Sequence, residues 1–221
     1  VEAVNGPVLL LAVPGSGKTT VLVTRLGYMV LCCDVPPAQI LTMTYTVAAT
    51  HEMRGRFSAR FGAELAGQMT FRTINGLSAV ILQYYSRVYG RRQPELLTNE
   101  GDITRMLTDI WQQVNREFPT ESTLKELRTA ITYIKNMALT DEEIEGLETD
   151  LASLPELYRR YQAALKRAGQ MDYDDQMVYA LQILRAAPPV LAYFQQRYKY
   201  FCVDESQDTS KIQHEIIRLL A

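Results

Sequence analysis

The sequence predicts an α/β fold, with a parallel sheet flanked by helices and interrupted by an all-helical insertion. Three observations predict it: short apolar runs that alternate with helical segments, a glycine-rich loop after the first run, and a middle third without a convincing strand. Strands of a parallel sheet are covered on both faces, so they read as unbroken apolar runs. With 47% hydrophobic and 22% charged residues among 221, the chain can bury a core.

The first part of the chain is expected to alternate strands and helices. The apolar run over residues 7–13 predicts a strand buried on both faces, and a helix from about 18 to 31 follows it. A strand, a helix, a strand and a helix are predicted next, in that order, over residues 39–45, 47–61, 68–72 and 74–89. Parallel strands joined by helices need right-handed crossovers.

A helical insertion is predicted over residues 93–171. Apolar residues recur at helical spacing from 103 to 111 and again from 124 to 134. Acidic amphipathic helices are expected over 141–167, with a break near Pro155. No strand is expected between these helices, so the insertion should form a helical subdomain.

The α/β pattern returns after the insertion. Two helices and a strand are predicted there, over residues 174–185, 190–198 and 200–203. The domain organisation that follows is one α/β core in two parts, 1–92 and 172–221, with the insertion between them.

Composition restricts the chemistry. Three cysteines and two histidines leave little material for a disulfide framework, a zinc site or a hydrolase triad, so we expect catalysis by carboxylates, lysine and a metal. The formal net charge is −2, but Lys and Arg outnumber Asp and Glu in residues 1–92, which places any polyanion at a local patch. No apolar run approaches the roughly 18 residues of a membrane helix, and the start does not read as a signal peptide, so we expect a cytoplasmic protein.

The glycine-rich loop fits the P-loop pattern, with alanine in place of the first glycine. Its residues are Ala12, Val13, Pro14, Gly15, Ser16, Gly17, Lys18 and Thr19. Small residues let backbone N–H groups face phosphates, and the following helix adds its positive N-terminus. Lys18 is expected to reach the outer phosphates of ATP, and the Thr19 hydroxyl to join the shell of a Mg²⁺ ion.

Two adjacent acids follow the last predicted strand. Asp204 is placed to bind Mg²⁺ together with Thr19, and Glu205 to take a proton from the attacking water. A neighbouring cation makes two ionised carboxylates tolerable at neutral pH. The predicted catalytic residues are therefore Lys18, Asp204 and Glu205.

Four stretches carry a family resemblance. Residues 204–209, Asp-Glu-Ser-Gln-Asp-Thr, resemble the Asp-Glu-x-Gln-Asp-Thr signature of the UvrD/Rep/PcrA-like superfamily 1 DNA helicases. Residues 44–56 are similar to the motif of that family that lies on single-stranded DNA, residues 70–73 to its Thr-Phe-His-Ser element, and residues 171–175 to its Asp-Phe-Asp-Asp segment. The resemblance covers the α/β part in order and spacing, and the insertion in position and character only.

The resemblance implies a RecA-like P-loop NTPase core in an ATP-dependent DNA helicase or translocase of DNA repair or recombination. It adds Thr20 and Gln207 to the nucleotide contacts. It implies single-stranded DNA contacts at Thr44, Tyr45, Arg54, Thr70, Phe71 and Arg72. The sequence departs from the family pattern at Val47, where a polar residue is usual, and at Arg72, which replaces a histidine. The resemblance also implies a fragment, nearly inactive alone, whose partner is the missing C-terminal half of the polypeptide.

Two other functions stay open. A P-loop small-molecule kinase would need an acceptor pocket and lid arginines, and the Gln-Asp-Thr sequence after the acid pair speaks against it. A nucleotide-binding interaction module without motor activity would bind a partner through the insertion, and the intact Lys18 and Glu205 speak against it.

An aromatic and basic cluster near the start of the insertion also has two interpretations. It contains Tyr84, Tyr85 and Tyr89 beside Arg87, Arg91 and Arg92. Tyrosines at helical spacing are more often core residues, whereas tyrosines beside arginines are also typical of nucleic-acid surfaces.

Overall fold

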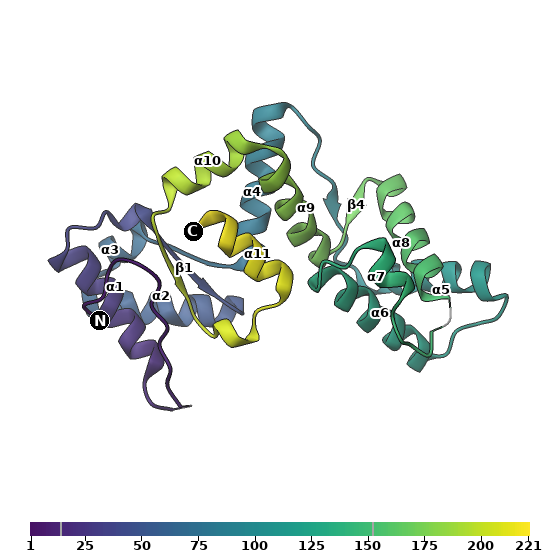
Figure 1. Cartoon of the computed structure of the whole chain (residues 1–221), viewed down its shortest axis with the longest axis horizontal. Helices are drawn as coiled ribbons and strands as arrows, with labels where there is room; N and C mark the ends of the chain where they lie inside the picture. Colours follow the sequence, from purple (N-terminus) through teal and green to yellow (C-terminus); the bar gives the residue numbers. More distant parts are fainter. Residues whose placement is uncertain (14, 152) are drawn as a thin grey trace. The chain divides into compact units, whose positions relative to one another are not determined.

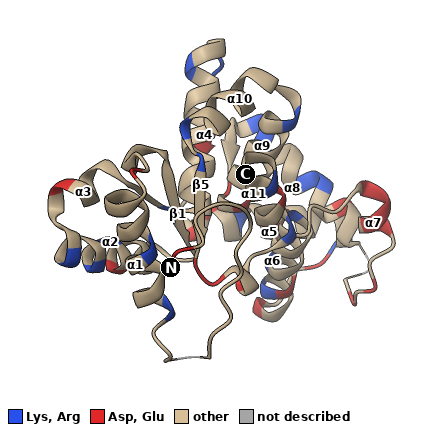
Figure 2. Cartoon of the chain, turned by 60° about the vertical axis from the view of Figure 1, so that its left-hand side comes forward, with Lys and Arg blue, Asp and Glu red and all other residues tan. Residues whose placement is uncertain are grey.

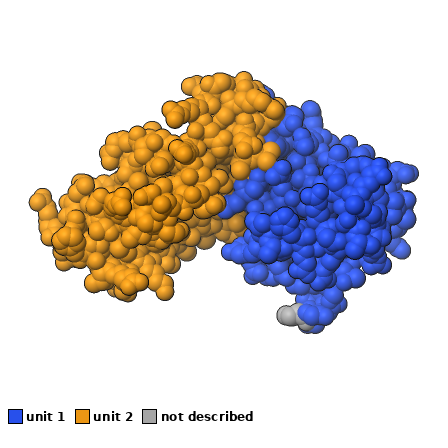
Figure 3. All heavy atoms as spheres, turned by 180° about the vertical axis from the view of Figure 1, so that it is seen from behind, with its two compact units in different colours: residues 1–77, 188–209, 217–221 blue, residues 78–187, 210–216 orange. Residues whose placement is uncertain are grey.

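The structure, a computed structural model, describes residues 1–13, 15–151 and 153–221. These residues form two compact units (Figure 3). Unit 1 contains Val1–Leu77, Pro188–Thr209 and Ile217–Ala221, and unit 2 contains Ser78–Ala187 and Ser210–Ile216.

Unit 1 is built on a three-stranded parallel sheet in the order β2-β1-β5 (Figure 1). The strands are β1 (Ile40–Thr44), β2 (Thr70–Thr73) and β5 (Tyr200–Val203). The central strand β1 is buried along its whole length. Because the strands are parallel, their carboxyl ends share one edge, where ligands of open α/β sheets usually bind.

Helices pack against this sheet. Unit 1 contains α1 (Lys18–Cys32), η1 (Pro37–Gln39), α2 (Val47–Phe61), α3 (Ala63–Gln68), α10 (Pro188–Arg197) and η2 (Ser206–Asp208). Leu26 and Met29 of α1 pack in one apolar core with Met53 and Phe57 of α2. These helices therefore hold the loop before α1 and the strand ends on a common scaffold.

Unit 2 is mainly helical. It contains α5 (Glu100–Asn115), α6 (Glu121–Asn136), α7 (Asp141–Glu145), α8 (Leu154–Ala168), α9 (Tyr173–Ala186) and a small parallel pair, β3 (Glu95–Leu96) with β4 (Gln170–Met171). Helix α4 (Ile74–Tyr89) begins in unit 1 and continues in unit 2, whereas α11 (Lys211–Leu220) does the reverse. Among the described residues no single helix is long and apolar enough to cross a membrane, although α9 and α10 taken together pass as a bent pair by length and composition.

The predicted mixed α/β fold with a parallel sheet flanked by helices is confirmed. The strands predicted at 39–45, 68–72 and 200–203 form β1, β2 and β5, with small shifts in their bounds. Residues 93–171 all lie in unit 2, which also includes flanking residues on both sides. The division into domains 1–92, 93–171 and 172–221 stays a prediction.

The strand predicted at residues 7–13 is wrong. The described residues of this segment form no strand, and their side chains are exposed, with Leu9 at 74% and Leu11 at 82%. Just before it, Val4 packs against the core of unit 1, and Arg25 of α1 donates hydrogen bonds to the carbonyls of Ala3 and Val4. A run of apolar residues shows that a segment can be buried, but pairing needs a long-range partner edge that the run does not specify.

One smaller prediction also needs correction. The insertion is not wholly helical, because Glu95 and Leu96 pair with Gln170 and Met171, and strands of two residues have no readable period. The break expected near Pro155 is confirmed, because α7 ends at Glu145 and α8 begins at Leu154, with Pro155 in its first turn, where proline is tolerated. Helix α3 was not predicted, and its six residues are too few to show helical periodicity.

Candidate functional site

The loop before α1 contains two glycines in the left-handed backbone region. Gly15 and Gly17 have positive φ angles of 77° and 87°, a conformation that favours glycine. Gly17 caps α1 without a side-chain hydrogen bond, and the first turn of α1 contains no acidic residue that would offset the positive end of the helix. Ala12, Val13, Ser16 and Thr20 are exposed, Thr19 is half-buried, and Pro14 lies outside the described residues.

Lys18 meets the predicted proton acceptor. Its Nζ atom lies 2.9 Å from Oε2 of Glu205, although the two residues are 187 positions apart in the chain. This hydrogen bond raises the pKa of Lys18 above its ordinary value. The pKa of Glu205 is lowered, first by the hydrogen bond from the Gln207 amide and then by the one from Lys18. Both residues are therefore charged at neutral pH.

Asp204 directly follows β5 and is half-buried. Its N–H donates to the carbonyl of Met43 over 2.9 Å, which extends the pairing of β5 with β1. Its carboxylate accepts from the N–H of Glu205, whose φ of 51° is left-handed. Burial, followed by the charge of Glu205, raises the pKa of Asp204. A nearby positive charge would favour the ionised form of this carboxyl.

The donors at this edge suit a magnesium ion carried by a ligand. The described residues contain no group of three or more His, Cys, Asp or Glu side chains that could hold a metal on its own. Magnesium usually takes only one or two protein carboxylates and completes its shell with water and substrate phosphates. A divalent cation would favour the ionised form of Asp204, which burial and Glu205 disfavour. The Asp204 carboxylate and the Thr19 hydroxyl are oxygen donors of the kind that Mg²⁺ prefers.

The predicted DNA contacts on β1 differ in exposure. Thr44 is buried, and its hydroxyl is hydrogen-bonded to the Thr46 carbonyl at 3.0 Å and to the Thr50 hydroxyl at 2.6 Å. Tyr45 follows at the end of the strand and is 59% exposed. Thr44 thus ties β1 to the start of α2, whereas the Tyr45 ring is available to a ligand.

The basic candidates on unit 1 also differ in whether they have an ion-pair partner; Figure 2 marks the Lys and Arg positions in blue. On α2, Arg56 pairs with Glu52 at 2.6 Å, whereas Arg54 is exposed and has no ion-pair partner among the described residues. Arg72 on β2 is likewise exposed and without such a partner in the described chain. Arg54 and Arg72 are therefore free to meet phosphates.

The neighbours of Arg72 on β2 are less accessible. Thr70 and Phe71 are half-buried, and the Phe71 ring lies 6.0 Å from the Phe57 ring in the core. Phe71 therefore helps to seat β2 against α2.

Sequence reasoning missed one buried charged group in unit 2. Lys135 of α6 is 2% exposed, and its Nζ lies 2.6 Å from Asp172 Oδ2 and 2.7 Å from Asp175 Oδ1. The Tyr161 hydroxyl also donates to Asp172. Two signals were available: Lys135 lies four residues after Ile131, on the apolar stripe, and Asp172 and Asp175 have the spacing of the capping box that begins α9.

Comparisons with known proteins agree with the motif analysis. The family model described as the UvrD/REP helicase N-terminal domain matches residues 1–221. The chain is 31% identical, over 227 residues, to the ATP-dependent DNA helicase PcrA of Leuconostoc citreum, and over 226 residues to that of Staphylococcus epidermidis. Both matches cover 100% of this chain and 30% of the relative. The chain therefore spans about a third of the length of these relatives.

Proposed function

This chain belongs to the UvrD/REP helicase N-terminal domain family, and from that premise we propose that it is the ATP-binding part of an ATP-dependent DNA helicase. In this proposal unit 1 is a RecA-like P-loop core that binds ATP with Mg²⁺ and grips single-stranded DNA. The setting is DNA repair or recombination in the cytoplasm.

One observation carries the proposal. The lysine of a glycine-rich loop at a helix N-terminus lies 2.9 Å from the carboxylate of Glu205, the second residue after the parallel strand β5, although the sequence separates Lys18 and Glu205 widely. Phosphoryl transfer by P-loop proteins needs a phosphate-binding lysine and an acid that positions or activates water at one place. A glycine-rich turn without this function has no need of the acid.

Each residue has a role in the proposed reaction. Lys18 exchanges Glu205 for the outer phosphates of ATP, while the N–H groups at the start of α1 receive the remaining phosphate charge. Glu205, thereby released, accepts the proton of the attacking water. Asp204 and Thr19 would hold Mg²⁺, which supplies charge neutralisation at the phosphates when bound. Gln207, which donates to Glu205, keeps that carboxylate ionised and oriented.

The proposed DNA surface lies at the carboxyl edge of the sheet. Tyr45 can stack on a base, while the guanidinium groups of Arg54 and Arg72 can meet phosphates. This surface is supported by the buried Thr44 and by the half-buried Thr70 and Phe71.

Rapid turnover should require more protein than this chain. In P-loop motors an arginine stabilises the charge of the transferred phosphoryl group, and its absence costs roughly 10³ to 10⁵ in rate. We propose that residues corresponding to the rest of the relatives' length supply it. This chain alone is then expected to bind ATP, hydrolyse it very slowly and unwind no DNA.

Calorimetric titration of the chain with Mg-ATP tests the nucleotide site. Lys18→Ala should abolish or strongly weaken binding, because its ammonium offsets phosphate charge that backbone N–H groups only partly offset. Lys125→Ala, which removes an exposed lysine of α6, is the matched control and should bind as the wild type does. Equal affinities for the wild type and Lys18→Ala would rule out the proposed site.

Anisotropy of a labelled oligothymidine tests the DNA surface. Arg54→Ala and Arg72→Ala should each weaken binding and reduce the slope of log affinity against log salt by about 0.7, the value for one phosphate contact on a single strand. Arg105→Ala, on the exposed side of α5, is the charge-matched control. Unchanged slopes in both unit 1 variants would show that DNA binds elsewhere.

A further inference from the structure

Unit 2 contains a hollow that the proposed function does not use. It has a volume of about 240 Å³ and lies between the end of α4, the segment that follows it, and α9. Its lining includes Tyr85, Arg91, Arg92, Tyr179 and Ile183. None of the described lining residues is acidic, so two guanidinium groups and two tyrosine rings give the hollow its chemistry.

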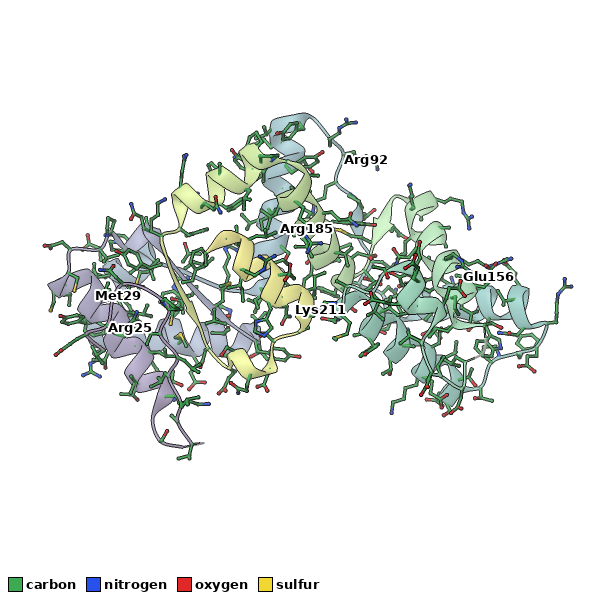
Figure 4. All side chains as sticks on the ribbon, in the orientation of Figure 1. Arg25, Met29, Arg92, Glu156, Arg185 and Lys211 are labelled. Carbon is green, nitrogen blue, oxygen red and sulfur yellow. The ribbon has the colours of Figure 1, made fainter. Side chains whose placement is uncertain are left out.

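A defined turn directs the two arginines to the hollow. Helix α4 ends at Tyr89, and Gly90 follows with a φ of 59°, in the left-handed region. The N–H of Arg91 donates to the carbonyl of Ser86 over 3.0 Å, which closes the helix end in the manner of a Schellman motif. Arg91 and Arg92 are thus presented from an ordered helix terminus, and Figure 4 shows the Arg92 side chain on the segment after α4.

The two arginines are not neutralised by an acidic side chain of the described residues. Within the part of the chain that the structure describes, neither has an ion-pair partner, whereas Arg185 of α9 is held by Glu215 at 2.9 Å. The C-terminus of α4 contributes about half a negative charge, which two guanidinium groups outweigh. The hollow therefore presents net positive charge at its rim.

The tyrosines provide flat apolar surface beside that charge. Tyr85 is half-buried, and its ring centroid lies 4.8 Å from that of Tyr89 one turn later, so two rings form a short aromatic ladder on α4. Tyr179 is half-buried on the α9 side, and burial raises its pKa to about 12, so it is a neutral hydroxyl donor at neutral pH. Rings beside arginines are the combination with which proteins stack bases and hold phosphates.

We propose that this hollow is a second binding site for single-stranded nucleic acid, which takes one unstacked base against Tyr85 and the adjoining phosphates at Arg91 and Arg92. The inference rests on the proposed DNA-dependent function but places the contact on residues of unit 2, whereas Tyr45 and Arg72 belong to unit 1. The volume favours part of a larger ligand, because pockets for whole drug-sized molecules are usually 300 Å³ or more. An acidic peptide would use the arginines but would leave the rings without a partner.

The test uses the whole chain and a labelled oligothymidine, read by anisotropy over a series of salt concentrations. The double variant Arg91→Ala with Arg92→Ala should bind more weakly and lower the salt slope by about 1.4, or 0.7 for each phosphate contact. The control double variant is Arg105→Ala with Arg167→Ala, which removes equal charge from exposed positions of unit 2 and should leave the slope unchanged. Equal slopes for the two double variants would overturn the proposal.

A second pair of variants tests the stacked base. Tyr85→Leu should weaken binding roughly fivefold to a hundredfold, whereas Tyr85→Phe, which keeps the ring, should bind almost as the wild type does. An unchanged thermal midpoint by circular dichroism shows that the leucine variant is folded. If the leucine variant does not fold, binding of the wild type to an abasic oligonucleotide, which has no base to stack, supplies the same test. Binding of that strand, or of polyglutamate, as tight as that of oligothymidine would overturn the proposal.

Photocross-linking with an iodouracil-substituted strand separates this proposal from the proposed function. Cross-linked peptides from α4 and α9 together with peptides from β1 support both sites. Peptides from β1 alone overturn the second site and leave the proposed function standing. Peptides from α4 and α9 alone, in a chain that binds no Mg-ATP, support the second site and overturn the proposed function.

Discussion

Each unit contains a lysine held by carboxylates, and the two arrangements differ in burial. In unit 1, Lys18 and Glu205 form one ion pair at 2.9 Å, with side chains 24% and 40% exposed. In unit 2, Lys135 is held by Asp172 and Asp175 at 2.6 and 2.7 Å, and the side chains of Lys135 and Asp175 are each only 1% exposed. Water and ligands can reach the first pair, whereas Lys135 and Asp175 of the second group are shielded from solvent.

The difference teaches that similar contacts can serve opposite purposes. An exposed ion pair adds little to folding, because water solvates both charges almost as well. A buried charge that loses its partner is costly, because the remaining charge has no solvent. We therefore expect the Lys18 pair to serve ligand exchange and the Lys135 group to hold α6, α8 and α9 in place.

The largest effect should come from Lys135→Met. This change leaves Asp172 and Asp175 without their cation and should cost unit 2 about 3–5 kcal/mol of unfolding free energy. The chain has one tryptophan, Trp111, which is buried in the core of unit 2, so its fluorescence in urea reports that unit. Lys18→Met is the matched variant and should leave the urea midpoint of the tryptophan transition unchanged. Equal losses of unfolding free energy in both variants would show that the two ion-paired lysines do not differ in their contribution to stability.

The pH dependence of the loss in unfolding free energy caused by Lys135→Met, called the deficit below, sharpens this prediction. Burial raises the pKa of Asp175, and Lys135 opposes that rise. Without Lys135 the folded pKa rises further, so the variant loses stability as pH rises from the unfolded value of about 3.9 through the folded pKa. The deficit relative to wild type should therefore be small below pH ~3.9 and full at neutral pH, which urea titrations by fluorescence would measure. A deficit that does not change with pH would show that lost packing, not charge, causes it.

A smaller effect is expected at Gly27, where packing rather than an ion pair holds α1. A Cβ at this position would overlap the ring of Phe61, so Gly27→Ala should cost unit 1 about 1–3 kcal/mol. Gly55→Ala on α2 is the control: its Cβ has open space, and the loss of a helical glycine should stabilise by about 0.5–1 kcal/mol. Denaturation followed by far-ultraviolet circular dichroism checks both, with the Trp111 signal expected to be unaffected. A destabilised Gly55→Ala would show that the control site is not open.

The smallest effect should follow from Glu205→Gln. The amide no longer holds the Lys18 ammonium as an ion pair, so Mg-ATP should bind about two- to fivefold more tightly while the thermal midpoint stays unchanged. Glu156→Gln on α8, which also breaks an exposed ion pair, is the control and should not alter the affinity (Figure 4). Calorimetric titration measures both; weaker binding by Glu205→Gln would show that Glu205 does not compete with the phosphates.

Local patterns predicted much of the structure because local chemistry decides it. The helices at 18–31 and 47–61 are found within a residue of their predicted bounds, since apolar spacing and caps such as Thr46 are local signals. Gly15 and Gly17 of the loop have positive φ angles, which glycine adopts without strain. The roles of individual loop residues in nucleotide binding stay predictions.

Local sequence patterns could not predict the long-range contacts. The run at residues 7–13 has the composition of a strand, but whether a strand forms depends on an edge elsewhere in the chain. The burial of Lys135 depends on α8 and α9, whose residues lie far along the sequence. The hollow beside Arg92 requires α4 and α9 to be neighbours.

The sequence by itself determined the chemical inventory: a glycine-rich loop with the P-loop pattern, an acid pair after a strand, and a mainly helical insertion. Residue type and local spacing specify such features because each depends on a few consecutive backbone units. Only the tertiary structure decided which charges meet. The Lys18 ammonium and the Glu205 carboxylate come within 2.9 Å because α1 and β5 pack in one unit, and Lys135 becomes buried because three helices enclose it. Packing sets the distance and the solvent exposure of a charge, and these two quantities determine whether an ion pair can be exchanged for a ligand or must remain.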